Sequence, residues 1–142
     1  MTDHQQVYRS EAETYQMLIS REDFQENLPA AIKNVVGLES RDLLDLGAGT
    51  GRISCEFVDQ VRSLTALDLS PGMLGVARQR LVRSGQSRWL AAAADHRQLP
   101  LPQKIVDLVI SAWSFSYLKV WSEGNWVPEI EQGLREVRRV LR

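Results

Sequence analysis

Three glycines stand within five positions of the segment LLDLGAGTGR, residues 43–52, directly after an apolar run. Each glycine costs conformational entropy on folding, so three together indicate a turn whose backbone something approaches closely. Asp45 stands two residues before Gly47, at the end of the expected strand. A carboxylate there repels phosphate and favours a cationic amine, which it can hold through a charge-assisted hydrogen bond. A tight turn without a ligand would need only one or two glycines.

The glycine spacing distinguishes this turn from two common phosphate-binding turns. The dinucleotide fingerprint is G-x-G-x-x-G/A, whereas Gly47, Gly49 and Gly51 are spaced G-x-G-x-G and Arg52 occupies the sixth place. No Gly-Lys-Ser/Thr follows, as a phosphate loop would require. The pattern therefore disfavours a nicotinamide dinucleotide and excludes a phosphate loop.

Two further carboxylates follow at the ends of later apolar runs. Asp68 stands 21 residues beyond Gly47, the place from which an acidic side chain accepts hydrogen bonds from ribose hydroxyls in the Rossmann arrangement. Asp95 ends a third run, where it could accept from a ligand or merely cap the next turn. Acceptors for an amine and a diol, beside open backbone for a carboxylate, describe an amino-acid nucleoside without phosphates.

Strands and helices alternate along the chain so that these turns fall where strands end. We expect strands over 41–46, 63–69, 88–94 and 105–112, and helices over 21–36, 52–60, 71–84 and from about 128 onward. This alternation predicts an α/β fold, a Rossmann-like three-layer sandwich around a parallel sheet. We expect a single domain over 1–142, with 1–20 as an N-terminal segment and 21–142 as the core. Ligands of such sheets bind beyond the carboxyl ends of the strands.

Composition excludes several other classes of protein. The 142 residues carry 17 basic and 18 acidic side chains, a net charge of −1, which provides no field for nucleic acid or an anionic membrane. Cys55 is the single cysteine and His4 and His96 are the two histidines, so no metal-site spacing exists. Neither a signal peptide nor a membrane span is indicated. We therefore expect a cytoplasmic protein without metal, nucleic-acid or membrane partners.

Several segments together resemble the class I S-adenosylmethionine-dependent methyltransferases, in particular small-molecule members of the methyltransferase-11 and ubiquinone type. DLGAGTGR (45–52) is similar to their first motif, and ALDLSPGML (66–74) to the acidic motif that follows. AADHRQLPLP (93–102) is similar to the adenine-side motif, IVDLVISAWSFSYL (105–118) to the fourth-strand motif, and EIEQGLREVRRVLR (129–142) to the next helix. The resemblance covers about residues 30–142. It implies S-adenosyl-L-methionine as cofactor and methyl transfer to a small-molecule acceptor.

The resemblance also implies which residues contact each part of the cofactor. Those expected around the methionine part are Asp45 and the backbone of Gly47, Ala48, Gly49 and Gly51. Those expected around the nucleoside are Asp68 at the ribose hydroxyls, Leu69 and Met73 against adenine, and Asp95 with the adjacent His96 backbone at the adenine amino group. Ser111 and Trp113 are expected to border the sulfonium and the acceptor, and Tyr8 and Tyr15 to belong to a segment that closes over the cofactor.

Some of these residues have an alternative without a ligand. Met73 and Leu69 could be core residues, and Cys55 is expected to be a small core residue. As a lone histidine in a loop, His96 is expected to be solvated and not a catalytic base, and we identify no catalytic residue. We expect the aromatic segment 112–126 to be a loop, which could form the wall of an acceptor pocket or pack beneath the final helix.

The family continues with strands five, six and seven, whereas this sequence ends at Arg142 on an expected helix. We therefore expect a C-terminally truncated chain with strand order 3-2-1-4 and the strand over 105–112 as an exposed edge. Such an edge favours pairing with a second chain, so the alternative to truncation is a chain that completes its sheet as a homodimer. Two alternatives remain for function. One is a non-catalytic S-adenosylmethionine-binding or interaction domain, and the other, disfavoured by the glycine spacing, is an NAD-dependent oxidoreductase.

Overall fold

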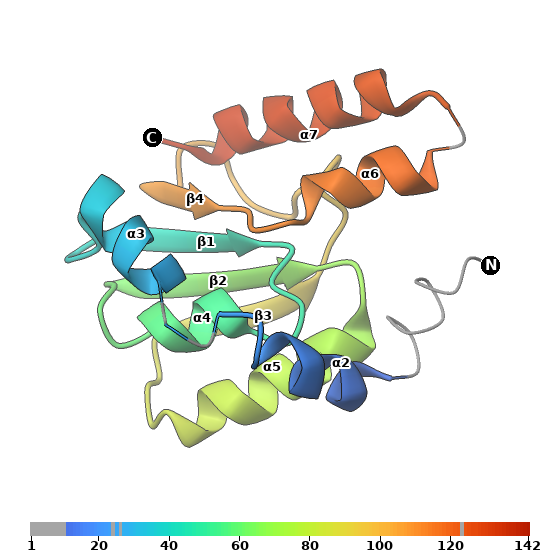
Figure 1. Cartoon of the computed structure of the whole chain (residues 1–142). Helices are drawn as coiled ribbons and strands as arrows, with labels where there is room; N and C mark the ends of the chain where they lie inside the picture. The colour runs from blue at the N-terminus through green and yellow to red at the C-terminus, as the bar shows by residue number, and fades with distance from the viewer. Residues whose placement is uncertain (1–10, 24, 26, 123) are drawn as a thin grey trace.

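The computed structural model describes residues 11–142 except 24, 26 and 123, and four strands in it form one parallel sheet. The strands are β1 (Asp42–Leu46), β2 (Ser63–Asp68), β3 (Trp89–Ala93) and β4 (Leu108–Ile110), in the order β3-β2-β1-β4 (Figure 1). The helices are α2 (Ala12–Ile19), α3 (Asn27–Val35), α4 (Arg52–Phe57), α5 (Pro71–Arg83), α6 (Phe115–Trp121) and α7 (Trp126–Val140). The predicted α/β Rossmann-like fold and strand order are confirmed.

The two faces of the sheet carry separate apolar clusters, because successive side chains of a strand point to opposite sides. Leu43 of β1 packs in one cluster with Phe57 of α4 and Leu81 of α5. Leu44, the next residue, packs in the other cluster with Val140 of α7. Figure 1 shows the corresponding layers, with α3, α4 and α5 on one side of the sheet and α6 and α7 on the other. Helices therefore cover both faces and leave the carboxyl ends of the strands for a ligand.

The helix predicted over 21–36 is wrong in its first part. α2 ends at Ile19, and α3 begins only at Asn27. Asp23 sets this start, because its carboxylate accepts hydrogen bonds from the amides of Asn27 at 3.0 Å and Leu28 at 2.8 Å. First-turn amides have no partner within a helix, and a side-chain oxygen supplies one. The turn between the helices allows α2 to lie beside α5 (Figure 1).

The C-terminal third also differs from expectation. Segment 112–126, expected as a loop, contains α6, and α7 begins at Trp126, so that Pro128 lies in its first turn, where proline is tolerated. β4 is shorter than the predicted 105–112, and Val106, just before it, forms a parallel bridge with Leu141. The amide of Arg142 donates to the Val106 carbonyl at 3.0 Å. The chain beyond α7 is thus held against the beginning of β4.

Candidate functional site

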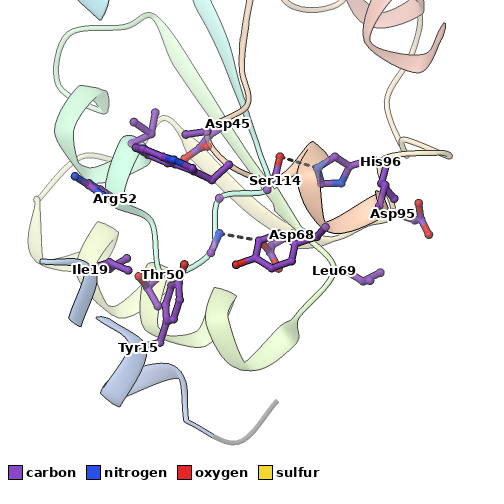
Figure 2. Close-up of a pocket in the computed structure, with 18 of the residues that line it drawn as sticks. Tyr15, Ile19, Asp45, Thr50, Arg52, Asp68, Leu69, Asp95, His96 and Ser114 are labelled. Atoms are coloured by element: carbon purple, nitrogen blue, oxygen red, sulfur yellow. Dashed lines mark hydrogen bonds between the residues drawn. The ribbon is translucent and has the colours of Figure 1, made fainter. Parts of the chain in front are cut away.

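A cavity of about 520 Å³ opens at the carboxyl ends of the strands. This volume lies within the usual range for small-molecule sites. The sequence-predicted residues that line it are Asp45, Gly47, Ala48, Gly49, Asp68, Leu69, Asp95, His96 and Trp113 (Figure 2). Gly51, Met73 and Ser111 do not line it. Gly51 is the N-cap residue before α4, the Met73 side chain is fully buried, and the Ser111 hydroxyl forms a hydrogen bond with Ser114. The structure thus brings together carboxylates that lie 50 residues apart in the chain.

The glycine loop after β1 needs glycine for two different reasons. Gly47 has a φ of +81°, and a Cβ there would lie 2.1 Å from the Ser114 Cβ, so the loop is packed against the segment that follows β4. Gly49 has a φ of +53°, and a Cβ there would meet nothing within 4 Å. Both φ values are ones that side chains other than glycine rarely adopt. Gly47 therefore serves the fold, whereas Gly49 presents bare backbone to open space in the cavity.

Asp45 places a carboxylate in the interior at the end of β1. Its side chain is 1% exposed, and one oxygen accepts a hydrogen bond from the Ser54 hydroxyl of α4 at 2.6 Å. No cation pairs with it among the residues that the structure describes. Burial raises the pKa of Asp45 from 3.8 to about 6, against the lowering effect of Ser54, and the charge of Asp68 raises it further. An unpaired buried carboxylate favours a cationic ligand, because such a ligand supplies the missing charge.

Asp68 is the second carboxylate of the cavity, at the end of β2. It is 8% exposed, and its two oxygens accept hydrogen bonds from the backbone amides of Gly49 and Ser70, each at 2.8 Å. Burial raises the pKa of Asp68, and the backbone hydrogen bonds counteract part of that rise. A carboxylate has about four lone-pair positions, and the amides of Gly49, Ser70 and Leu69 use at most three of them, so Asp68 can accept a further hydrogen bond. The geometry suits an acceptor for hydroxyl groups.

Asp95 differs from the other two carboxylates because it already has a cationic partner. Arg97 donates to both of its oxygens, with its Nε at 2.9 Å and its Nη2 at 2.5 Å. The same guanidinium reaches Glu129 of α7 at 2.5 Å. Hydrogen bonding from Arg97 lowers the pKa of Asp95. Asp95 therefore joins the loop after β3 to α7 through Arg97, a connection that its position in the sequence does not indicate.

His96 is not solvated, which corrects the expectation for a lone loop histidine. The side chain is 9% exposed and lies in the cavity wall, with its ring edge-on to Phe115 at a centroid distance of 5.2 Å. Its Nε2 lies 2.9 Å from the Ser114 hydroxyl, the contact drawn in Figure 2. Burial lowers the pKa of His96. The ring that the sequence suggested was a surface group is part of the site.

Helix α2 forms a wall of the cavity that the sequence motifs do not include. Tyr15 and Ile19 of α2 line the cavity, whereas Tyr8 lies outside the described residues. Gln16 fixes this helix, because its side-chain oxygen accepts from the Thr50 hydroxyl and from Arg80 Nη1 at 3.0 Å. The same Arg80 nitrogen donates to the Thr50 carbonyl at 2.7 Å. One glutamine thus joins α2 to both the glycine loop and α5.

Trp113 lies at the rim in an unusual backbone conformation. Its φ is +57°, in the left-handed region that bulky residues avoid, and its side chain is 61% exposed. The guanidinium carbon of Arg52 lies 5.4 Å from the ring centroid, within cation–π range, and Arg52 also pairs with Glu22 at 3.1 Å. Backbone strain of this kind is often found at functional sites.

Comparison with known proteins places the chain in a family. A model of the methyltransferase domain matches residues 44–142, and the chain belongs to this methyltransferase family. The malonyl-[acyl-carrier protein] O-methyltransferase of Geobacter sulfurreducens is 36% identical over 107 residues, which are 74% of this chain and 36% of that protein. The enzyme of the same name from Serratia marcescens is 39% identical over 100 residues, 70% of this chain and 34% of that protein. The chain spans about a third of the length of these relatives.

A solved structure agrees with the family assignment. The S-adenosylmethionine-dependent methyltransferase from Mesorhizobium loti is 25% identical and superposes with a TM-score of 0.62, covering 80% of this chain and 47% of that one. The cofactor of this family is S-adenosyl-L-methionine. Family membership also argues against the NAD-dependent oxidoreductase that the glycine spacing disfavours.

The residues of the cavity fit this cofactor. It carries an ammonium group and a sulfonium, and Asp45 offers a buried carboxylate without a cationic partner among the described residues. It carries a ribose diol, and Asp68 retains acceptor positions beside Gly49. It has no phosphate, and the two arginines that line the cavity, Arg52 and Arg97, are paired with acidic side chains of the described residues. No cluster of histidine, cysteine and acidic side chains among those residues could hold a metal ion.

Proposed function

We propose that this chain binds S-adenosyl-L-methionine in the cavity at the carboxyl ends of the strands and transfers its methyl group to a small-molecule acceptor. The observation that carries the proposal is the Asp45 carboxylate, buried at the end of β1 beside bare glycine backbone and lacking a cationic partner among the described residues. Leaving such a group ionised costs folding free energy, and a bound cation offsets that cost.

The proposed contacts follow from where each residue lies. Asp45 would hold the ammonium group, and the backbone at Gly49 would admit the methionine part close to the loop. Asp68 would accept from the ribose hydroxyls, with Leu69, 52% exposed at the cavity edge, beside the adenine ring. Asp95 is held by Arg97, so any hydrogen bond to the adenine amino group would use a lone pair that Arg97 leaves open.

The chain's part in the reaction would be alignment. The cofactor supplies an electrophilic methyl group on a sulfonium, which is already a good leaving group. Holding two reactants in line can lower a barrier by up to roughly 7–11 kcal/mol. Tyr117 and Leu118 of α6 line the cavity beside Trp113, which supports the proposal that segment 112–126 forms an acceptor wall. Trp126, in the same segment, lies outside the cavity lining.

Two measurements test the proposal. Calorimetric titration with S-adenosylmethionine, S-adenosylhomocysteine and NADH should give binding of the first two only. Incubation with cofactor labelled in the methyl group and a deproteinised small-molecule extract should then label a product, and the Asp68→Ala variant should label it more slowly when the cofactor is below saturation. Binding without any transfer would favour the non-catalytic cofactor-binding domain, and binding of NADH alone would contradict the proposal.

We also propose a cytoplasmic location, no nucleic-acid partner, and a homodimer formed through the β4 edge of the sheet. β4 pairs with β1 on one side, and among the described residues its other side is joined only near Val106, by Leu141. An open strand edge favours pairing with another strand. No described helix has the length and apolar character needed to cross a membrane. Sedimentation of the chain at several concentrations tests the dimer, and a monomer throughout would contradict it.

A further inference from the structure

The Ser114 hydroxyl has three neighbours that together fix the direction of every hydrogen bond around it. Its Oγ lies 2.9 Å from the Leu46 carbonyl oxygen, 2.9 Å from His96 Nε2 and 2.5 Å from the Ser111 hydroxyl. A serine hydroxyl has one hydrogen to donate and two lone pairs that accept. The carbonyl of Leu46 can only accept, so it takes the Ser114 hydrogen. The other two neighbours must therefore both donate to Ser114.

This arrangement determines the tautomer of His96. Because Nε2 donates to Ser114, Nε2 carries the hydrogen, and in a neutral imidazole Nδ1 then holds a lone pair. The neutral form is favoured because burial, foremost, lowers the pKa of His96; Arg97 acts in the same direction, and Asp95 opposes them. No described residue forms a hydrogen bond with Nδ1. His96 lines the cavity, and Nδ1 is its ring nitrogen without a hydrogen-bond partner among the described residues.

The ring is held firmly beside the glycine loop. Phe115 contacts it edge-on, with an angle of 79° between the rings. On the loop side, a Cβ at Gly47 would lie 3.3 Å from His96 Nε2, so the absence of a side chain there leaves room for the ring. Serine, phenylalanine and glycine together give the imidazole one orientation. Figure 2 shows the ring pointing from the Asp95 side of the cavity toward Ser114.

We propose that Nδ1 of His96 is the proton acceptor of this site, and that the methyl acceptor is a neutral molecule with a hydroxyl group on an aromatic ring. The proposal rests on the methyl-transfer function proposed above. Trp113, Tyr117 and Leu118 provide apolar and aromatic wall for such a ring. When the hydroxyl oxygen forms its bond to the methyl carbon, the carbon–sulfur electron pair stays on sulfur and the hydroxyl proton goes to Nδ1. The charge that leaves the sulfonium thus appears on the imidazolium.

The first test reads the tautomer directly and needs no substrate. The chain has two histidines, His4 and His96, so a ¹⁵N-histidine spectrum of the His4→Gln variant contains His96 alone. With S-adenosylhomocysteine bound at pH 7, His96 should be neutral with hydrogen on Nε2, and Ser114→Ala should produce a mixture of tautomers. Hydrogen on Nδ1 in the unsubstituted site, or a charged ring at pH 7, would overturn the proposal.

The second test uses phenol and anisole, two ligands that share a ring and differ in the hydroxyl hydrogen. With S-adenosylhomocysteine bound, phenol should bind about 3- to 10-fold more tightly than anisole and should shift the Nδ1 resonance. His96→Phe keeps a ring but removes both nitrogens, so the two ligands should then bind alike. Equal binding of phenol and anisole by the unsubstituted chain would overturn the inference and leave the proposed function intact. Failure of S-adenosylhomocysteine itself to bind would instead contradict the proposed function.

Discussion

The backbone amide of Gly49 donates a 2.8 Å hydrogen bond to the Asp68 carboxylate, which joins the loop after β1 to the end of β2. The other carboxylate oxygen accepts from Ser70 at the start of α5. One side chain therefore sets the shape of the glycine loop and also offers acceptor positions to a ligand. Loop geometry and ligand recognition depend on the same group.

Replacing Asp68 should weaken cofactor binding. Asp68→Ala removes charged hydrogen bonds, which contribute about 1.5–3 kcal/mol each, and calorimetry should show a loss of S-adenosylhomocysteine affinity of that size. Asp68→Asn keeps one acceptor oxygen and should lose less. Asp59→Ala removes the same charge at an exposed position away from the cavity and is the matched control. An Asp68→Ala variant that binds as tightly as this control would remove Asp68 from the site.

Two glycine substitutions should separate the fold from the ligand space. Gly47→Ala should destabilise the chain by roughly 3–5 kcal/mol, because the new Cβ would overlap Ser114 and the φ is strained. Gly49→Ala meets no neighbour and should cost only the strain, about 1–2 kcal/mol, yet it should weaken S-adenosylhomocysteine binding at least 10-fold. Thermal unfolding and calorimetry measure the two effects. Undiminished binding by Gly49→Ala would show that the ligand does not approach this backbone.

Asp45 should make stability and binding respond to pH in opposite directions. Because its pKa is raised from 3.8 to about 6 in the folded chain, its ionisation costs folding free energy, and the cost appears as pH rises from about 4 to 6. Asp45→Asn should therefore stabilise the chain at pH 8 by up to about 3 kcal/mol and have little effect near pH 4. Denaturant unfolding of the unsubstituted chain and the variant measures the difference in free energy of unfolding. Asp42, whose pKa Arg62 lowers, contributes with the opposite sign, but equally in both proteins, so its contribution cancels.

Cofactor binding should show the complementary trend. The unsubstituted chain should bind S-adenosylhomocysteine less tightly as pH falls below about 6, because Asp45 takes up a proton and loses its charge. The Asp45→Asn variant should bind weakly throughout and lose most of this change; any remaining decrease at low pH would come from Asp68, whose pKa burial also raises. A variant that is destabilised at pH 8, or an affinity of the unsubstituted chain that is constant between pH 5 and 8, would contradict this account of Asp45.

The left-handed backbone at Trp113 can be tested with two small residues. Both Trp113→Ala and Trp113→Gly remove the contact with Arg52, but only glycine adopts a φ of +57° without strain. Glycine avoids the strain but has greater conformational entropy in the unfolded chain, which opposes folding. The glycine variant should therefore be more stable than the alanine variant by a net of roughly 0.5–1 kcal/mol. Chemical unfolding of the pair gives this difference. The reverse order would show that Trp113 carries no backbone strain.

The sequence predicted those parts of the site whose signal is local. Glycine spacing and strand-end carboxylates located Asp45, Gly49 and Asp68 at one cavity, because parallel strands bring their carboxyl ends to the same edge. The alternation of elements predicted a parallel sheet covered on both faces, and the resemblance to the methyltransferase family implied the strand order. These features depend on residues that are close in sequence or on a rule that holds for the whole fold class.

The features that the sequence did not predict depend on contacts between distant side chains. Gln16 meets Arg80 across 64 positions, and no local pattern marks either residue. The sequence indicated a solvated loop residue at His96. It is buried because Phe115 of α6 packs against it, and that helix was itself expected to be a loop. The sequence left Asp95 as either a ligand acceptor or a turn cap, and it did not predict the ion pair with Arg97, whose side chain could equally have pointed to solvent.

The most direct test of the central claim compares S-adenosylhomocysteine with 5′-methylthioadenosine, which keeps the nucleoside and the sulfur but lacks the amino-acid end. The unsubstituted chain should bind S-adenosylhomocysteine at least 10-fold more tightly, and Asp45→Asn should remove most of this preference. Equal affinity of the two ligands for the unsubstituted chain, or a preference that survives in Asp45→Asn, would show that the buried carboxylate does not hold the charged end of the cofactor.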